Sequence, residues 1–233
     1  LEGYPLVISS SHLVAKGILT SPDQLHISYV HTPVRYAWDQ MNIYLKRSFL
    51  ARIGLEPLIR WQLHTLRQWD QLSSSRIDYL VANSNFTARR IKKYWRRHSE
   101  VLHPPVNVDR FKWNKPREDF YLSVCRLVPN KRVDLVVRAF NKLKLPLVVV
   151  GDGVEKAYLK EIAGPTVQIL GFQNQDKIEK LMSKCRAFVY AGVEDFGIAP
   201  VEAMASGAPV IAFGKGGVLD TVKCINSNSN NVA

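Results

Sequence analysis

The chain contains few cysteines and no long apolar run, and each of these absences excludes a class of protein. Its three cysteines, Cys125, Cys185 and Cys224, lack the spacing of metal ligands and form no even set for pairing. They therefore favour a reducing compartment over a disulfide framework. No segment reaches the roughly 18 uninterrupted apolar residues of a membrane-spanning helix, and no secretory leader is recognisable at the start. We therefore expect a cytoplasmic protein.

Acidic residues are also scarce relative to basic ones. Lysine and arginine number 32 against 20 aspartates and glutamates, which gives a net charge of +12 and an isoelectric point near 9.7. This balance predicts an acidic partner: nucleic acid, anionic lipid or a phosphorylated small molecule. The cations gather in "ARRIKKYWRR", residues 88–97, and are scattered through residues 46–67. A solvated helix face explains such charge runs equally well.

Length and composition allow a folded chain with one large or two small domains. Hydrophobic residues make up 46% of the 233 positions, which is enough to bury a core. The adjacent Pro104 and Pro105 disfavour helix on either side and mark the domain boundary. We therefore expect an N-terminal domain over 1–104, a second domain over 105–222 and a polar tail over 223–233.

Short β-branched runs alternate with helical stretches through the second domain. This alternation is typical of a parallel sheet covered by helices, and several runs are as continuously apolar as strands buried on both faces. We expect strands at 120–127, 145–153, 167–172, 185–192 and 208–214, and helices at 131–144, 154–163, 175–184 and 199–206. The first domain should hold strands at 25–33 and 77–84, a long basic helical stretch over 39–72, and a helix after the cap candidates Asn83 to Asn85. The predicted fold class is α/β.

Two glutamates flank a Phe-Gly turn in the stretch "VEDFGIAPVEAMASGAPVIAFGKGG", residues 193–217. Glu194 falls just past the carboxyl end of an expected strand, where open α/β sheets bind ligands. Gly197 lacks a Cβ, and the N–H groups at 197–199 open the following helix toward an anion. Glu202 is placed to accept hydrogen bonds from vicinal hydroxyls such as those of a ribose. The stretch indicates a phosphate and sugar site, although the helix dipole alone also favours glutamates at a helix start.

Further motifs accompany this pair of glutamates in a fixed order. The segment "SVCRLVPNKRVDLVVRAF" holds an arginine and a lysine in a loop, "VVVGDGVEKAYL" holds a Gly-x-Gly turn, and "VQILGF" is a strand. Upstream lie "HISYVHTPVRYAWD", "VANSNFTARRI" and "HPPVNVDRF". Together with the E-x7-E pattern, these motifs resemble the retaining GT-B-fold glycosyltransferases of the group 1 (GT4) family. The resemblance implies two Rossmann-like domains that face a cleft, the N-terminal one present only in part.

The resemblance also implies a role for each matching residue. Arg126 and Lys131 match the pair that clamps the diphosphate of the donor, where fixed cations stabilise the leaving group without a metal. Glu194 matches the glutamate that faces the donor sugar, and Glu202 matches the one that contacts the ribose. His31 matches the acceptor-domain histidine that faces the sugar across the cleft. Further donor-binding positions are Phe196, Gly197, Ile198, Gly151, Gly171 and Phe172.

Ordinary structural roles explain some of these residues as well. His31 would also suit a hydrogen-bonded histidine at a strand end, and Phe172 would suit a core position. The arginine and lysine segment would suit a solvated loop. His12, which follows three serines, is a further candidate for contact with the acceptor. The expected catalytic set is His31, Arg126, Lys131 and Glu194, and we expect neither a metal nor a cofactor besides the donor substrate.

The implied reaction transfers a sugar from a nucleotide diphosphate sugar to a glycan or lipid-linked acceptor, with retention at the anomeric carbon and without a metal. Front-face attack through an oxocarbenium-like transition state is expected, rather than a covalent intermediate on Glu194. We expect a hexosyltransferase of polysaccharide or glycolipid assembly, held at the inner face of an anionic membrane by the aromatic and basic residues of 88–97 and the cations of 46–67.

Two alternative functions stay open. One is a basic module that binds nucleic acid or an anionic membrane without catalysis, although no nucleic-acid-binding signature is present and no nucleic acid partner is expected. The other is a different GT-B enzyme, such as a sugar-nucleotide epimerase or a phosphorylase.

Both ends of the chain depart from the family pattern. The chain begins at Leu1, shortly before the strand-like "PLVISSS", without the glycine-rich loop that family members carry after their first strand. Its end, "KCINSNSNNVA", does not resemble the family's last helices. We therefore expect a fragment that turns over its substrates poorly by itself.

Overall fold

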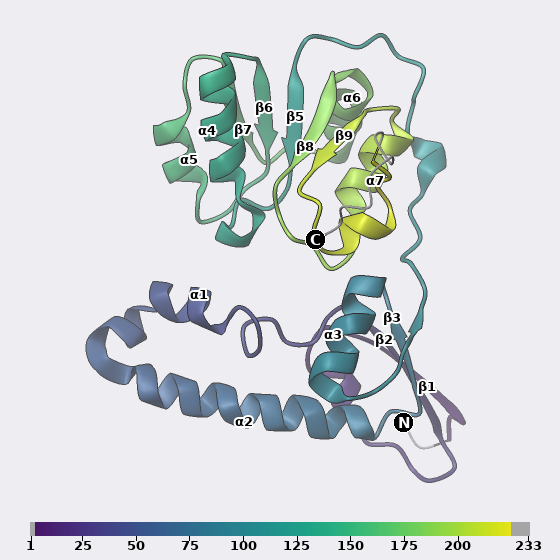
Figure 1. The fold of residues 1–233 in the computed structure, drawn as a ribbon. Helices are drawn as coiled ribbons and strands as arrows, with labels where there is room; N and C mark the ends of the chain where they lie inside the picture. Colours follow the sequence, from purple (N-terminus) through teal and green to yellow (C-terminus); the bar gives the residue numbers. More distant parts are fainter. Residues whose placement is uncertain (1–2, 225–233) are drawn as a thin grey trace. The chain divides into compact units, whose positions relative to one another are not determined.

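The chain folds into two compact units, each built around its own parallel sheet (Figure 1). The computed structural model describes residues 3–224. Unit 1 spans Leu1–His103 and unit 2 spans Pro104–Ala233. The strand pairings of both sheets are parallel, which requires a crossover between successive strands and explains why helices alternate with strands. The α/β class expected from the sequence is confirmed.

The sheet of unit 1 has the strand order β1-β2-β3-β4. Its strands are β1 (Leu6–Ser11), β2 (Leu25–Val30), β3 (Tyr79–Ala82) and β4 (Glu100–Val101), and α3 (Asn85–Trp95) follows β3. Val30 and Leu80 of the sheet are buried in one apolar cluster with Ile91 and Trp95 of α3. This cluster places α3 against the sheet.

Helix α3 carries the basic and aromatic stretch that the sequence offered as a membrane contact. Its N-terminal cap is Ser84, whose hydroxyl accepts from the Thr87 N–H at 3.0 Å. Trp95 is 3% exposed, and Arg90 is 6% exposed and pairs with Asp39 at 2.8 Å. The expectation that the tryptophan of this stretch lies at a membrane interface is therefore wrong, because its ring completes the core of unit 1.

Between β2 and β3 the chain forms a helical hairpin rather than one long helix. Its elements are α1 (Met41–Arg47), η2 (Ala51–Leu55) and α2 (Glu56–Ser75). Gly54, with a φ of +89°, interrupts the helical path, because a residue without a Cβ adopts this conformation most readily. The helix expected over 39–72 is therefore correct in type but bent. Among the residues described, no helix has the length and apolar character needed to cross a membrane.

A buried ion pair joins α2 to the segment after β1. The short helix η1 (Ala15–Gly17) carries Lys16, whose ammonium lies 3.0 Å from Asp70 Oδ1; the two side chains are 2% and 0% exposed. The indole N–H groups of Trp38 and Trp95 donate to Asp70 Oδ2 at 2.8 and 2.7 Å. The Lys16 ammonium also lies 4.1 Å from the centre of the Trp69 ring. This network holds α2 in place, because a buried charge without its partner is costly.

The sheet of unit 2 has the strand order β7-β6-β5-β8-β9. Its strands are β5 (Tyr121–Val124), β6 (Leu147–Val150), β7 (Val167–Gly171), β8 (Ala187–Tyr190) and β9 (Val210–Ala212). Its longer helices are α4 (Val133–Leu143), α5 (Lys156–Ile162), α6 (Gln175–Lys184) and α7 (Ile198–Ala205). Short 3-10 helices are η3 (Val108–Arg110), η4 (Pro129–Lys131) and η5 (Gly217–Asp220).

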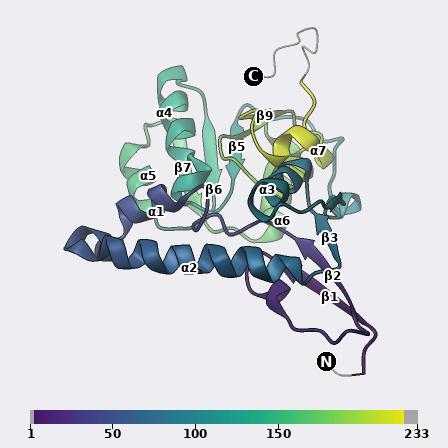
Figure 2. The ribbon, with the colours of Figure 1, turned by 60° about the horizontal axis from the view of Figure 1, so that its bottom comes forward.

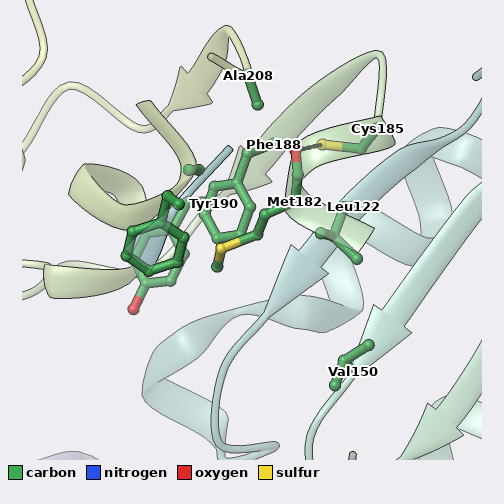
Figure 3. Packing of buried hydrophobic residues seen from close by; sticks show 9 residues of the cluster. Leu122, Val150, Met182, Cys185, Phe188, Tyr190 and Ala208 are labelled. Atoms are coloured by element: carbon green, nitrogen blue, oxygen red, sulfur yellow. Dashed lines mark hydrogen bonds between the residues drawn. The ribbon is translucent and has the colours of Figure 1, made fainter. Parts of the chain in front are cut away.

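Two apolar clusters cover the two faces of this sheet. One packs α4 and α5 against the sheet, with Phe140 and Leu159 among its buried residues. The other packs α6 and α7 against it and includes Leu122, Met182 and Phe188 (Figure 3). Because both faces are covered, the edge at which the strands end is left for polar side chains.

Candidate functional site

The order of strands in unit 2 reverses between β5 and β8. From β5 the chain proceeds through β6 to β7 on one side of the sheet, and from β8 it proceeds to β9 on the other. Ligands of open parallel sheets bind beyond the carboxyl ends of the strands at such a switch point. The segments that leave β5 and β8, residues 125–132 and 191–197, therefore form the rim of the candidate site.

Lys131 and Glu194 meet at this point, although they lie 63 residues apart in the sequence. Lys131 is the last residue of η4, and Glu194 follows β8. The Lys131 ammonium and the Tyr190 hydroxyl both donate to Glu194 Oε1. The Lys131 and Glu194 side chains are 18% and 17% exposed, so both charges are partly shielded from water yet open to a ligand. The structure thus brings together two of the four residues expected to act in catalysis.

The backbone at Glu194 is fixed by the loop that follows β9. Glu194 forms an isolated parallel bridge with Gly216, and the Gly217 N–H donates to the Glu194 carbonyl oxygen at 2.8 Å. A Cβ at Gly217 would lie 2.2 Å from the Asp195 carbonyl oxygen. A side chain at Gly217 would therefore push the two segments apart and move the Glu194 backbone.

Arg126 is an exposed cation just beyond the end of β5. The loop that carries Arg126 packs against the Gly-x-Gly turn after β6. The Cys125 N–H donates to the Val150 carbonyl oxygen there at 3.1 Å. A Cβ at Gly151 would lie 1.8 Å from the Cys125 carbonyl oxygen. The absence of a side chain at Gly151 therefore lets the two loops approach closely. A contact between Gly151 and a donor stays a prediction.

The first turn of α7 presents backbone donors beside Glu194. Gly197, with a φ of +97°, takes the left-handed conformation that glycine favours, and a Cβ there would lie 3.8 Å from Glu194 Cβ. The N–H groups of Ile198 and Ala199 fall in the turn that lacks acceptors within the helix, which favours an anion at this end. Phe196 is buried, whereas Ile198 is 47% exposed. Of the two, the side chain open to a ligand is Ile198.

Glu202 lies on the second turn of α7, where other charges act on it. Burial is the main cause that raises its pKa above the ordinary value; Arg110 of η3 opposes this shift, and Glu179 of α6 adds to it. Arg110 and Glu179 themselves pair at 2.5 Å. The structure therefore places Glu202 beside η3 and α6 rather than in the Lys131–Glu194 pair. Hydrogen bonds from hydroxyl groups, such as those of a ribose, would stabilise the charged form of this half-buried carboxylate.

Gly171 and Phe172 lie at the end of β7. Gly171 has a φ of +76°, and a Cβ there would lie 2.9 Å from the Lys156 ammonium. Phe172 is 77% exposed, so the alternative of a core position is wrong. Its ring lines a hollow of about 430 Å³ together with polar residues between Gln173 and Lys180. An exposed ring in this place is suited to stacking on a base.

The two histidines singled out in the sequence belong to unit 1. His31 directly follows β2; its Nε2 atom lies 2.8 Å from Ser10 Oγ, and its ring meets Tyr29 edge to face. His12 directly follows β1 and is exposed. Both therefore lie at the carboxyl edge of the unit 1 sheet. The hydrogen-bonded histidine that the sequence allowed is present, and a role of His31 in catalysis stays a prediction.

The sequence reasoning missed Tyr190. Its ring is 5% exposed and stacks near Phe188 in the core of unit 2, with 6.2 Å between the ring centres (Figure 3). Its hydroxyl nevertheless reaches the Glu194 carboxylate. The signal in the sequence is a tyrosine at the end of an apolar strand, four residues before Glu194, because a buried ring with a polar tip needs a partner for that tip.

The cysteines predict a selective labelling pattern. Burial raises the pKa of Cys125 to about 11, in spite of Lys131 nearby, and burial raises the pKa of Cys185 to about 11 as well. Because the thiolate is the reactive form, iodoacetamide at about pH 8 should modify the exposed Cys224 at least about tenfold faster than the half-buried Cys125 or the buried Cys185. Raising the pH should speed the reaction of Cys125.

Mass spectrometry of partly labelled chain measures these rates. In urea all three cysteines should react alike, which separates the effect of folding from the chemistry of the reagent. If Cys125 in the folded chain reacts as fast as Cys224, its pKa is not raised as described above.

Comparisons with known proteins identify the family of the chain. The profile of the family described as glycosyl transferases group 1 matches residues 106–226, more than half of the chain. The chain is 26% identical over 211 residues to the α-1,3/1,6-mannosyltransferase ALG2 of Rhizomucor pusillus, a match that covers 66% of this chain and 46% of the relative. It is 33% identical over 114 residues to the GDP-mannose-dependent α-mannosyltransferase of Mycobacterium tuberculosis, covering 48% of this chain and 30% of the relative.

A solved structure extends the likeness over most of the chain. The crystal structure of HepE from Anabaena in complex with UDP-glucose superposes with a TM-score of 0.70 at 20% identity, covering 95% of this chain and 63% of that one. At this identity the likeness concerns the fold. The chain spans between 30% and 63% of the length of these three proteins. By its family profile and its pair of parallel α/β units, the chain belongs to the group 1 glycosyltransferases of GT-B fold.

Proposed function

We propose that the chain carries the donor site of a glycosyltransferase that moves a sugar from a nucleotide diphosphate sugar to a glycan or lipid-linked hydroxyl, with retention at the anomeric carbon and without a metal. The observation that carries the proposal is the Lys131–Glu194 pair at the switch point of the unit 2 sheet. Lys131 supplies a positive charge for phosphate, and Glu194 supplies an acceptor for sugar hydroxyls. Arg126 adds an exposed cation from the same loop.

Transfer requires that the charge on the departing diphosphate be stabilised. The bond between the anomeric carbon and the diphosphate oxygen breaks, and a bond from the acceptor oxygen to the same carbon forms. Lys131 and Arg126 are suited to the negative charge on the leaving group, and the backbone N–H groups at the start of α7 add to their effect. The proton of the acceptor passes to the departing phosphate oxygen, so the step needs no side chain as a base.

Glu194 has one carboxylate oxygen for the donor in this scheme. Its Oε1 atom already accepts from Lys131 and Tyr190, so Oε2 is the atom offered to the sugar. Hydrogen bonding to sugar hydroxyls orients the anomeric carbon without the covalent bond that a retaining glycosidase forms. Tyr190 then acts as a positioning residue, because its ring is fixed in the core.

GDP-mannose is the first donor to test. One relative is named as a GDP-mannose-dependent mannosyltransferase and another as a mannosyltransferase. The HepE structure holds UDP-glucose, which makes UDP-glucose the second donor to test. Phe172 offers the base an aromatic face that does not discriminate between guanine and uracil, so the choice between them rests on the binding measurement.

Calorimetric titration of the chain with GDP-mannose, UDP-glucose and ADP-glucose tests the proposal. We expect saturable binding of one nucleotide class. Glu202→Ala should weaken that binding about tenfold, because the ribose hydroxyls lose a charged acceptor. Glu161→Ala on α5 removes an exposed glutamate and serves as the matched control. The proposal would be overturned if the chain is folded by circular dichroism and binds none of the three donors.

The stereochemistry and the rival enzyme classes need a product measurement. Nuclear magnetic resonance of the transferred sugar should show the same anomeric configuration as in the donor. An inverted product would refute retention while leaving the donor site intact. An epimeric sugar nucleotide formed without acceptor would favour an epimerase, and a sugar phosphate formed from a glycan and inorganic phosphate would favour a phosphorylase.

A further inference from the structure

The tip of the helical hairpin in unit 1 exposes a dense set of large apolar side chains. We define the hairpin tip as residues 49–61, which run through η2 into the first turns of α2. Six large apolar residues within it are between 41% and 71% exposed: Phe49, Leu50, Ile53, Leu55, Leu58 and Trp61. Exposing so many large apolar side chains within 13 residues is unfavourable in water and is typical of an interaction site.

The hairpin tip projects away from the rest of unit 1. Helix α2 has 20 residues and is therefore about 30 Å long. Its far end is anchored by Asp70 in the buried ion pair, whereas Figures 1 and 2 both show the bend after α1 at the end remote from the sheet. Among the described residues, apart from the neighbouring backbone, no atom lies within 4 Å of the place where a Cβ of Gly54 would stand, so this position faces open space.

Basic residues accompany the apolar ones. Arg52 within the tip and Lys46 just before it are exposed, and Arg60 is 46% exposed at its side chain. Between residues 46 and 61 the acidic residue is Glu56, and it already pairs with Arg60 at 2.7 Å. Tryptophan, phenylalanine and leucine side chains among arginine and lysine form the composition of segments that lie in the plane of a membrane interface. Tryptophan prefers the headgroup level, and the cations favour anionic lipid.

We propose that the hairpin tip inserts shallowly into an anionic membrane, with its apolar side chains at the acyl-chain boundary and its cations against the lipid phosphates. A second copy of the chain fits this surface poorly, because two cationic tips repel each other. The proposal goes beyond the donor site, since it concerns unit 1 and needs no sugar nucleotide. Cosedimentation of the full chain with lipid vesicles therefore tests it independently of the proposed function.

The vesicle experiment compares two lipids and two kinds of variant. The chain should pellet with vesicles that contain phosphatidylglycerol at about 50 mM salt, and at least about tenfold less with phosphatidylcholine alone or at about 500 mM salt. The double variant Phe49→Ser with Trp61→Ser should lose at least about tenfold in binding to the anionic vesicles. Lys46→Glu with Arg52→Glu should remove the preference for anionic lipid. Trp113→Ser, which removes a tryptophan that is 72% exposed on unit 2, is the matched control and should bind like the original chain.

Two results would overturn the proposal. One is a serine variant of the tip that keeps its circular dichroism and binds anionic vesicles as well as the original chain. The other is a chain that is oligomeric by sedimentation velocity without lipid and becomes monomeric in the tip variant, which would make the tip a contact between copies. Because the substituted side chains are exposed, the folded state should survive; Ile53→Ser provides a second tip variant if the double variant does not fold.

Discussion

Replacing Asp70 by alanine is expected to lower the free energy of unfolding of unit 1 by about 3–5 kcal/mol, because the substitution leaves the Lys16 ammonium buried without its counter-charge. The side chains of Lys16 and Asp70 are 2% and 0% exposed, so water does not replace the lost partner. The same change removes the acceptor of two indole N–H groups, those of Trp38 and Trp95. Urea denaturation followed by far-ultraviolet circular dichroism measures the loss.

A control on the same helix separates burial from charge. Glu56→Ala breaks the exposed pair with Arg60, whose partners are 43% and 46% exposed, and should cost at most about 0.5 kcal/mol. Asp70→Asn keeps an acceptor for the indoles but not the charge, so its effect should fall between those of the two alanine variants. A similar small loss for Asp70→Ala and Glu56→Ala would show that the buried network does not fix α2.

The loss at Asp70 should also depend on pH. Burial lowers the pKa of Lys16 from 10.5, and the Asp70 charge opposes that shift. Removing the carboxylate therefore lowers this pKa further in the folded state than in the unfolded one. Because the unfolded chain then binds more protons, the stability of the variant should rise with pH toward 10.5, and the difference from the original chain should shrink. A difference that grows over the same range would contradict this account.

Lys131→Ala is expected to weaken binding of the nucleotide diphosphate sugar by about 10- to 100-fold, because the phosphates lose a charge-assisted hydrogen bond. The effect should be larger for the diphosphate than for the nucleoside without phosphates, which isolates the contribution of charge. Lys131→Arg should retain part of the affinity. The calorimetric titration used for the donor site measures the affinity of each variant for both ligands.

The neighbouring residue gives the matched control. Arg132 is exposed and pairs with Asp134 at 3.2 Å, on the side of the loop that leads into α4. Arg132→Gln removes the same unit of charge and should change donor affinity less than about twofold. If both variants lose affinity equally, the loss reflects the general basic charge of unit 2 and not a contact of Lys131.

The elements around the candidate site were predictable because local signals agree there. The helix expected over 175–184 has those bounds in the structure, and Asn174 caps it by accepting from the Lys177 N–H at 3.0 Å. The strand expected over 185–192 forms as Ala187–Tyr190, since its apolar run is buried on both faces of the sheet. Hydrophobic periodicity, helix caps and the glycine and proline residues of turns each involve only a few neighbouring residues, so they can be read directly from the sequence.

Side-chain partners that are distant in sequence were not predictable in the same way. The family resemblance placed Lys131 and Glu194 in one donor site. The pattern around Lys131 does not itself show that it pairs with Glu194, 63 residues later, because the order of strands that brings them together is a property of the whole sheet. Trp95 was misassigned for the same reason: amphipathic spacing does not reveal that Asp70 lies opposite its indole. The bend at Gly54 was missed because a single glycine inside a helical pattern is usually tolerated.

The aromatic lining of the Lys16–Asp70 pair gives the chain a built-in optical probe. Trp38, Trp69 and Trp95 all touch this pair, whereas Trp113 is the one tryptophan that unit 2 contributes to the total of five. Intrinsic fluorescence and near-ultraviolet circular dichroism of the chain therefore report mainly on unit 1. Unfolding of unit 1 should change these spectra strongly, while the loss of unit 2 should show mainly in far-ultraviolet ellipticity, so the two units can be followed separately in one unlabelled sample.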